Sequence, residues 1–317
     1  MSLHPDLAGF LELVEMGRLM GNSQPMHQLS VEQARREFAS SSAILDPSPP
    51  AALEVTELSI VARDGATLAA RLYRGEGPRP AAQPTILYLH GGGYVVGSLD
   101  SHDSVCRRLA ADGRFAVLAA DYRLAPEQRF PTASNDVLDV ADWLAAQAST
   151  LGLDAARVAV AGDSVGATLA TVLALAAQKG ETRLAPVAQM LFYPVTDTSR
   201  ERDSYVRYAE GYLLESATLR WFYDLYLAEP RQRLDWRASP LLIEQLPAQV
   251  PSFVSLAGHD PLYDEGLAWA ERLQASGTEV TLDLQPQLTH DFLRMSGMVP
   301  EVQGIYDRAL EWLFQRC

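Results

Sequence analysis

The chain has 317 residues, of which 48% are hydrophobic and 21% charged, a composition that suits one large α/β domain with insertions. Its 40 acidic and 26 basic residues give a formal net charge of −14, which disfavours nucleic acids and anionic membranes as partners because both are polyanions. The two cysteines are Cys106 and the terminal Cys317, so we expect no disulfide framework and a reducing, cytoplasmic location.

The first 50 residues predict a helical segment that precedes the main domain. Residues 5–45 read as two helices with a break near 21–25, and a proline-rich linker follows at 46–50. The first helix carries Glu12 and Glu15 inside its apolar stretch and lacks a basic start, which indicates an amphipathic helix rather than a signal peptide. No apolar run approaches the length of a membrane span.

Short apolar strands alternate with helical patterns from residue 51 to the end of the chain. Two strands, 53–62 and 67–74, flank Asp64-Gly65 and predict a β-hairpin. Further strands are predicted at 84–90, 115–121, 157–162, 187–194, 252–258 and 278–286, and helices at 101–112, 134–148, 164–179, 263–276 and 302–315. This alternation predicts a mostly parallel sheet of about eight strands, covered by helices on both faces, with the hairpin at one edge.

One segment interrupts the alternation. Residues 200–238 are rich in charged and aromatic side chains, and we expect an insertion with one helix at about 216–228. Its aromatic residues are expected mostly to pack this helix onto the core. The last strand is expected at an exposed edge of the sheet, which makes it a candidate seam for a homodimer.

A serine lies where a parallel sheet usually carries its ligands, beyond the carboxyl end of a strand. The strand 157–162 runs into Gly162-Asp163-Ser164-Val165-Gly166, which matches the pattern G-x-S-x-G. The pentapeptide alone is a weak signal, because a serine before a helix is often only a cap. Its position between a buried strand and an apolar helix favours Ser164 as an exposed nucleophile.

A serine nucleophile needs a base and an acid, which in such a sheet follow it in the order Asp or Glu, then His. His290 follows the last strand and Asp260 follows the strand 252–258, so both are expected on the same rim as Ser164. His259 is the rival base, but the adjacent Asp260 could not easily orient it. Asp264 is the rival acid, yet it falls in the first turn of a helix, where carboxylates favour the helix dipole. We therefore predict the triad Ser164, Asp260 and His290.

Three consecutive glycines, 91–93, follow the strand 84–90 at the same rim. Each costs roughly 0.5–1 kcal/mol of chain entropy relative to alanine, so a merely structural turn rarely needs three. Attack on a carbonyl creates an oxyanion that backbone N–H groups must stabilise. We expect Gly92 and Gly93 to donate to it, together with the N–H of Val165 directly after the nucleophile.

Taken together, these motifs resemble the hormone-sensitive-lipase-like esterases of the α/β-hydrolase fold. The shared motifs are HGGGY (90–94), DYRLAPE (121–127), FP (130–131), GDSVG (162–166), DPLYDEG (260–266) and HDF (290–292). The short chain and GSLDSHD (97–103) resemble the bacterial acetyl esterase branch. Over residues 53–317 the resemblance implies a serine hydrolase of acetyl to butyryl esters, with the same triad and oxyanion residues and no metal or cofactor. It also implies that the N-terminal helices and the insertion form a cap.

Three positions depart from the family pattern. Val165 stands where alanine is usual and Ala167 where a second glycine is usual, and the added bulk would narrow the pocket. Asp291 replaces a small residue, and a second carboxylate beside His290 could raise the pKa of that histidine. In DYRLAPE, Arg123 and Glu127 are expected to brace the glycine loop by hydrogen bonds.

Other functions are compatible with the same residues. An amidase or aryl-formamidase would use the same triad on a different bond, and no motif separates these activities from an esterase. A receptor that lost catalysis is disfavoured because His290 is in place, and nothing indicates the large apolar lid of a true lipase. Substrate contacts are open, with Tyr94, Tyr193 and Tyr212 as candidates.

Overall fold

An eight-stranded sheet forms the centre of the protein in the computed structural model, which describes residues 2–77 and 79–317. Its strands are β1 (Leu53–Val61), β2 (Thr67–Gly75), β3 (Gln83–Leu89), β4 (Ala116–Ala120), β5 (Leu153–Asp163), β6 (Ala188–Phe192), β7 (Ser252–His259) and β8 (Val280–Thr289). They lie in the order β1-β2-β4-β3-β5-β6-β7-β8, with β1 antiparallel to β2, β2 antiparallel to β4, and the remaining pairs parallel. The predicted hairpin occupies one edge and β8 the other.

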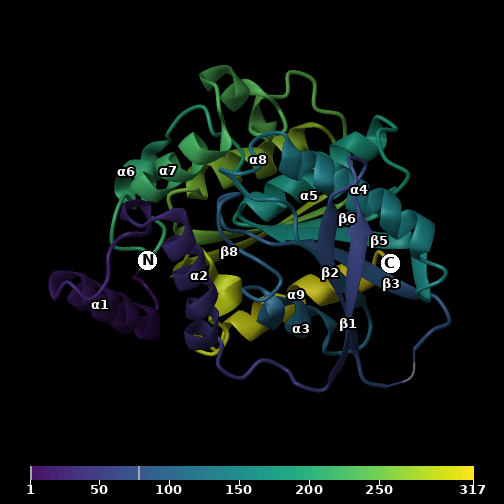
Figure 1. The fold of residues 1–317 in the computed structure, drawn as a ribbon, viewed down its shortest axis with the longest axis horizontal. Coiled ribbons are helices and arrows are strands. Elements are labelled where there is room, and N and C mark those ends of the chain that lie inside the picture. The colour runs from purple at the N-terminus through teal and green to yellow at the C-terminus, as the bar shows by residue number, and fades with distance from the viewer. Residues whose placement is uncertain (1, 78) are drawn as a thin grey trace.

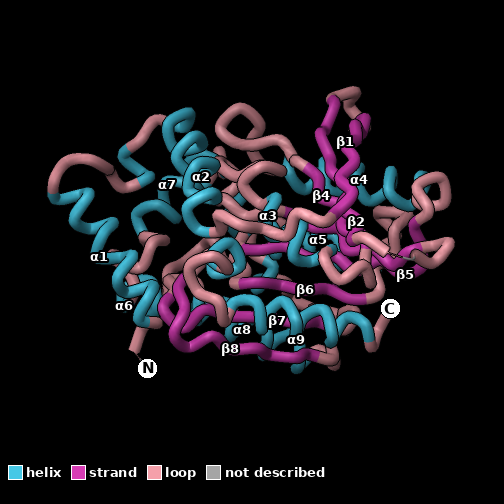
Figure 2. The backbone as a smooth tube through the Cα atoms, turned by 90° about the horizontal axis from the view of Figure 1, so that it is seen from below, coloured by secondary structure: helices cyan, strands magenta, loops and turns pink. Residues whose placement is uncertain are grey.

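Helices cover both faces of this sheet, as Figures 1 and 2 show. They are α3 (Asp103–Ala110), α4 (Thr132–Gln147), α5 (Val165–Gln178), α8 (Tyr263–Ala275) and α9 (Val302–Phe314). Side chains of a strand point alternately to opposite faces. In β3, Leu87 and Leu89 accordingly join the core cluster of α4, α5 and α8, whereas Ile86 and Tyr88 join that of α3 and α9. The predicted two-faced α/β architecture is confirmed.

Two segments outside this core gather beside the carboxyl ends of the central strands, and we call them the cap (Figure 1). Residues 5–45 form α1 (Pro5–Leu19), η1 (Met26–Gln28) and α2 (Val31–Leu45), and residues 200–238 contain α6 (Asp203–Arg207), α7 (Ser216–Tyr226) and η2 (Pro230–Leu234). The two segments meet where Arg18 donates to Glu215 and where His27 Nδ1 lies 3.3 Å from Thr218 Oγ1. No described helix is both long enough and apolar enough to cross a bilayer.

The insertion differs from the expectation of a single helix. The expected helix is present as α7, but the five-residue α6 and the 3₁₀ turn η2 flank it. Elements this short leave almost no periodic pattern in a sequence, because periodicity is read over windows of more than ten residues. Two further 3₁₀ turns, η3 (Pro240–Leu242) and η4 (Phe292–Met295), lie outside the cap.

Candidate active site

Ser164 stands on a sharp turn between β5 and α5. Its backbone has φ +54° and ψ −123°, in the left-handed region that costs a non-glycine residue about 1–3 kcal/mol. The turn needs a close approach, since a β-carbon on Gly166 would overlap the carbonyl of Leu89 in β3. The helix that starts at Val165 places its N-terminus beneath the serine, where developing negative charge is favoured. The local structure therefore holds the hydroxyl at the rim of the sheet.

His290 and Asp260 come directly after neighbouring strands, β8 and β7, and their side chains meet. The imidazole Nδ1 lies 2.7 Å from Asp260 Oδ2, and both residues are buried. The other carboxylate oxygen accepts the N–H of Leu262 at 2.8 Å. Because the carboxylate accepts from Nδ1, the proton sits on Nδ1, and Nε2 is the ring nitrogen that is able to accept a proton.

The charge around His290 favours its protonated form. Burial by itself lowers the pKa of this imidazole, but the hydrogen-bonded Asp260 and the charges of Asp291 and Asp163 outweigh burial and raise it. Asp291 thus acts in the direction expected from the sequence. The neutral imidazole is consequently lost at a higher pH than for an ordinary histidine.

One cavity of about 370 Å³ joins these groups to the cap. Ser164, His290, Gly92, Gly93 and Val165 all line it. Most of the opposite wall is apolar and comes from the cap, with contributions from Phe10, Val14, Phe38, Leu213, Leu219 and Phe222. Sequence reasoning missed these wall residues, since an apolar residue of a cap helix carries no signal that separates a cavity wall from core packing.

Hydrogen bonds to both the N–H and the C=O of Gly91 hold the glycine loop, residues 91–93. Gly91 N–H donates to Asp163 Oδ1 at 2.9 Å, and His90 Nδ1 donates to the Gly91 carbonyl at 2.7 Å. Burial and the nearby His102 lower the pKa of His90 to about 4, so this ring is neutral. In a trans peptide the C=O and the next N–H point in opposite directions, so the Gly92 N–H is turned away from His90.

The second peptide of the loop is fixed in the same way. The carbonyl of Gly92 accepts the N–H groups of Val95 and Val96 at 3.0 and 2.9 Å, which turns the N–H of Gly93 to the opposite side. Gly92 itself has φ +116°, and a β-carbon there would overlap the carbonyl of Val96. Both amides therefore belong to a rigid loop that lines the cavity.

The rival base and acid lie elsewhere. The ring of His259 packs against those of Tyr208 and Tyr212, with centroids 5.5 Å from each, and the residue does not line the cavity. Asp264 accepts the N–H of Ser204 in α6 at 2.8 Å, so its carboxylate ties the cap to α8. The structure brings Asp260 and His290 together, and His290 lines the cavity.

The three tyrosines considered for substrate contact are not among the described residues that line the cavity. Tyr94 is fully buried and stacks on Tyr226, with centroids 3.8 Å apart. Tyr193 packs against the ring of His290 in a tilted contact, with 4.6 Å between centroids. Tyr212 of the cap stacks on His259 at the end of β7. Their rings are used in packing, which a motif does not distinguish from substrate binding.

Bracing of the glycine loop differs from the expectation. Arg123 does not reach the loop, because its guanidinium pairs with Asp136 at 2.6 Å and with Asp64 at 2.7 Å. Glu127 acts indirectly through Arg35 of α2, which binds this carboxylate at 2.7 Å and donates from Nε to the carbonyl of Val95 at 2.9 Å. The cap, rather than Arg123, supports this side of the loop.

One group of side chains has the spacing of metal ligands in the described part of the chain, namely His102, Asp163 and Asp291, whose ligand atoms lie within 4.8 Å of one another. The guanidinium of Arg294 lies 2.6 Å from Asp291, and Asp163 already accepts from Tyr88. A cation would therefore compete with a positive charge and with existing hydrogen bonds, so the set does not fit a metal.

Comparison with known proteins is consistent with this geometry. Residues 86–294 match the family described as alpha/beta hydrolase fold. The chain is 51% identical over 304 residues to ethyl acetate hydrolase of Pseudomonas putida, covering 95% of each chain. It is 40% identical over 254 residues to carboxylic ester hydrolase LipN of Mycobacterium tuberculosis, covering 78% of this chain and 67% of the relative.

Two solved structures superpose on nearly the whole of this chain. A thermostable esterase from Pseudomonas putida superposes with a TM-score of 0.92 at 32% identity, covering 99% of this chain and 98% of that one. An alpha/beta hydrolase enzyme from the metagenome of Lake Arreo in Spain gives 0.93 at 35% identity, with the same coverage. The chain therefore belongs to the alpha/beta hydrolase fold family, in the hormone-sensitive-lipase-like group that its motifs resemble.

Proposed function

We propose that this carboxylic ester hydrolase cleaves short-chain acyl esters, from acetyl to butyryl, through an acyl-enzyme on Ser164. One observation carries the proposal: Ser164, His290 and the glycine loop line a single cavity, and Asp260 is hydrogen-bonded to the imidazole from behind. This is the arrangement that acyl transfer needs, with a nucleophile, a base, an acid that orients the base, and amides for the oxyanion.

In the first half-reaction, Ser164 Oγ attacks the ester carbonyl while His290 Nε2 takes the hydroxyl proton. The carbonyl π electrons move to the oxygen, and the N–H groups of Gly92, Gly93 and Val165 stabilise the resulting anion. When this tetrahedral species collapses, the bond to the alkoxy oxygen breaks. The leaving oxygen takes the proton from His290, so an alcohol departs and the acyl group stays on the serine.

Water completes the second half-reaction. His290 removes a proton from the water as its oxygen attacks the acyl carbon, and the same amides stabilise the second oxyanion. Collapse breaks the bond to Ser164 Oγ, which regains the proton from His290, and a carboxylic acid is released. Asp260 keeps the proton of the imidazole on Nδ1 and stabilises its charged form in both halves.

The cavity lining favours a small ester that carries no negative charge. The ring of Phe222 lies so close to Gly93 that a β-carbon on this glycine would overlap it, which limits the space beside the oxyanion amides. The wall's two arginines are engaged by carboxylates, Arg18 by Glu215 and Arg294 by Asp291. The relative named ethyl acetate hydrolase points to the same size of substrate.

The test is a series of p-nitrophenyl esters of increasing acyl length, assayed with wild type and Ser164→Ala. We expect the highest kcat/KM between acetyl and butyryl, and a loss of at least about 10⁴-fold in kcat for the alanine variant. Ser134→Ala, which removes a buried hydroxyl on α4 outside the cavity, serves as the matched control and should keep wild-type activity.

Three results would contradict the proposal. An optimum at about eight carbons or more would reject the short-chain preference, and near wild-type turnover by Ser164→Ala would reject the nucleophile. Equal or better turnover of matched amides would favour the amidase or aryl-formamidase alternative. A cytoplasmic location, the absence of nucleic-acid, membrane or cofactor partners, and a homodimer seam at the edge strand β8 stay predictions from the sequence.

A further inference from the structure

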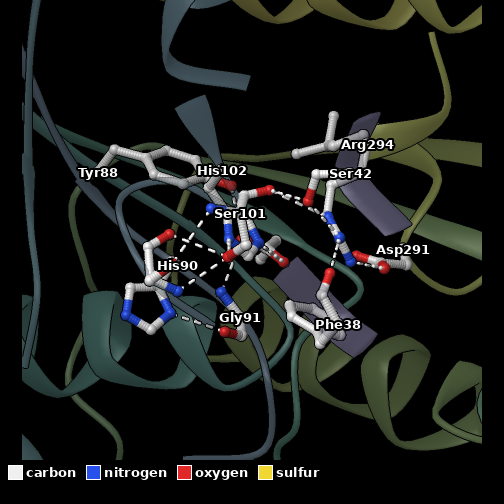
Figure 3. A network of polar contacts seen from close by, with 12 residues as sticks. Phe38, Ser42, Tyr88, His90, Gly91, Ser101, His102, Asp291 and Arg294 are labelled. Atoms are coloured by element: carbon white, nitrogen blue, oxygen red, sulfur yellow. Dashed lines mark hydrogen bonds and ion pairs between the residues drawn. The ribbon is translucent and has the colours of Figure 1, made fainter. Parts of the chain in front are cut away.

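A buried arginine lies beside the catalytic histidine and has no part in the reaction as written above. Arg294 is in η4, four residues after His290, and only 1% of its surface is exposed. Burying a guanidinium is costly unless its N–H groups are bonded and its charge is balanced. Arg294 satisfies both conditions, with partners from three separate segments of the chain (Figure 3).

The first segment is α2 of the cap. Nη2 of Arg294 donates to the carbonyl of Phe38 at 2.9 Å and to the hydroxyl of Ser42 at 2.7 Å, and the guanidinium lies 3.9 Å from the centroid of the Phe38 ring. A hydroxyl contact to Ser41 at 3.0 Å completes this set. The arginine therefore fixes the helix that carries one wall of the cavity, since Phe38 and Ser41 both line it.

The second segment carries the catalytic base. Nη1 donates to Asp291 Oδ2 at 2.6 Å, and Asp291 directly follows His290. Asp291 has φ +71°, a left-handed conformation that a non-glycine residue adopts at a cost. The ion pair with Arg294 thus holds a strained residue beside the imidazole and balances the negative charge there.

The third segment leads to the glycine loop. Arg294 Nε donates to the carbonyl of Ser101 at 3.2 Å, and the hydroxyl of Ser101 lies 2.9 Å from His102 Nδ1. His102 Nε2 lies 3.3 Å from Asp163 Oδ2, and the other oxygen of Asp163 accepts the N–H of Gly91 at 2.9 Å. A continuous line of polar contacts therefore runs from Arg294 to the first peptide of the loop (Figure 3).

Asp163, at the far end of this line of contacts, is fixed by hydrogen bonds and by its charge. Burial alone would raise the pKa of Asp163, but His102 and the hydrogen bond from Tyr88 at 2.6 Å lower it to about 2. Asp163 is therefore an anion at neutral pH, and each of its two carboxylate oxygens has a polar partner. A displacement of Ser101 or His102 would reach the glycine loop through this carboxylate.

We propose that Arg294 is a positioning residue for the ester hydrolysis, because it fixes the cap helix α2, the His290 loop and the glycine loop relative to one another. The inference rests on the proposed function, since it assigns a task within that reaction. A residue that only anchored α2 to the core would change the thermal stability of the protein. It would leave the chemistry of His290 and of the oxyanion amides unchanged.

Charge and geometry can be separated by substitution. The charged groups that face His290 are Asp260, Asp291 and Asp163, with Arg294 beyond Asp291. The other partners of Arg294 are neutral. Arg294→Lys keeps the positive charge but loses the planar fork, so it tests geometry. Arg294→Gln loses the charge as well, and Asp291→Asn removes the negative charge while asparagine tolerates the left-handed backbone.

The measurements are kcat, KM, the pH dependence of kcat/KM and thermal unfolding. For Arg294→Lys we expect kcat to fall about ten- to a hundred-fold with KM within about three-fold, because misplacement by about 1 Å carries a cost of this size. In Arg294→Lys the acid limb, which is the fall of kcat/KM at low pH, should stay at the same pH as in wild type. In Arg294→Gln it should move to higher pH, since Asp291 is left unbalanced, and in Asp291→Asn to lower pH.

Arg108 offers a matched control. Its guanidinium binds both oxygens of Asp46, directly after α2, at 2.7 and 2.8 Å, yet it lies outside the cavity. Arg108→Lys should lower the melting temperature while kcat and the pH profile stay within about two-fold of wild type. If Arg294→Lys behaves like Arg108→Lys, the inference is overturned. If neither Arg294 variant folds, Asp291→Asn decides, because it breaks the ion pair that ties Arg294 to the His290 loop. A kcat within about two-fold of wild type in Asp291→Asn then overturns the inference.

Failure of the inference and failure of the proposed function give different results. Wild type that neither turns over p-nitrophenyl acetate nor reacts with a fluorophosphonate would reject the function itself. Wild type that does both, alongside Arg294 variants with unchanged kcat and pH profile, would reject only the positioning role.

Discussion

The contact between Asp260 and His290 gives the sharpest quantitative prediction. Asp260→Asn removes one negative charge from a carboxylate oxygen 2.7 Å from the imidazole and keeps the shape of the side chain. With an effective dielectric constant of about 20, a unit charge at this distance stabilises the imidazolium by about 6 kcal/mol. An amide can also hold the wrong tautomer of the imidazole, and in other triads this substitution costs about 10⁴-fold in kcat, equivalent to about 5.5 kcal/mol.

We therefore expect Asp260→Asn to lower kcat for p-nitrophenyl acetate by about 10³- to 10⁴-fold, with little change in KM. Asp264→Asn is the matched control. It is the same substitution four residues along, at a carboxylate that accepts a cap N–H and does not touch His290. Its kcat should stay within about three-fold of wild type, although the cap contact is weakened.

The assay is steady-state turnover at a pH above the acid limb, with both variants checked for a wild-type melting curve. Retention of more than about a tenth of wild-type kcat by Asp260→Asn would show that the charge at 2.7 Å does not serve the reaction. A larger loss in Asp264→Asn than in Asp260→Asn would show that the acid has been assigned to the wrong residue.

Two further predictions concern the glycine loop and a buried acid. Gly92→Ala places a β-carbon against the Val96 carbonyl at φ +116°, so the loop must shift, and kcat should fall about 10²- to 10³-fold, as for loss of one oxyanion donor. Unchanged kcat would contradict this. Burial raises the pKa of Glu265 to about 8 despite the N–H groups of Thr196 and Asp197. The folded protein therefore binds a proton that the unfolded chain has released above about pH 4.5, and stability falls with rising pH up to about 8, by at most about 1.4 kcal/mol per pH unit. Glu265→Gln should remove this slope in urea unfolding at about pH 5, 7 and 9, and equal slopes would contradict the assignment.

The fold was predictable because its signals are local and repeated. Continuous apolar strands such as 84–89 identify a sheet covered on both faces, and the alternation with helices identifies parallel strands. Positions at the carboxyl ends of such strands share one rim, so Ser164, Asp260 and His290 could be grouped without coordinates. The short α6 was missed because five residues carry no periodic pattern.

The walls and supports of the site were not predictable in the same way. Phe38 and Phe222 line the cavity only because α2 and α7 are packed over the sheet, and their sequence pattern is that of any buried helix face. Arg294 has the sequence appearance of a surface residue, since arginine is rarely fully buried, and its partners lie up to 256 residues away. Contacts of this range depend on the tertiary arrangement, which no single sequence pattern encodes.

The central claim is that the Ser164 hydroxyl is an activated nucleophile beside His290. The direct measurement is the intact mass of the protein after treatment with a fluorophosphonate, followed by mapping of the modified peptide. We predict one adduct, on the peptide that contains Ser164, and none in Ser164→Ala, with labelling slowed in Asp260→Asn. An unmodified wild-type protein, or an adduct that persists in Ser164→Ala, would contradict the account.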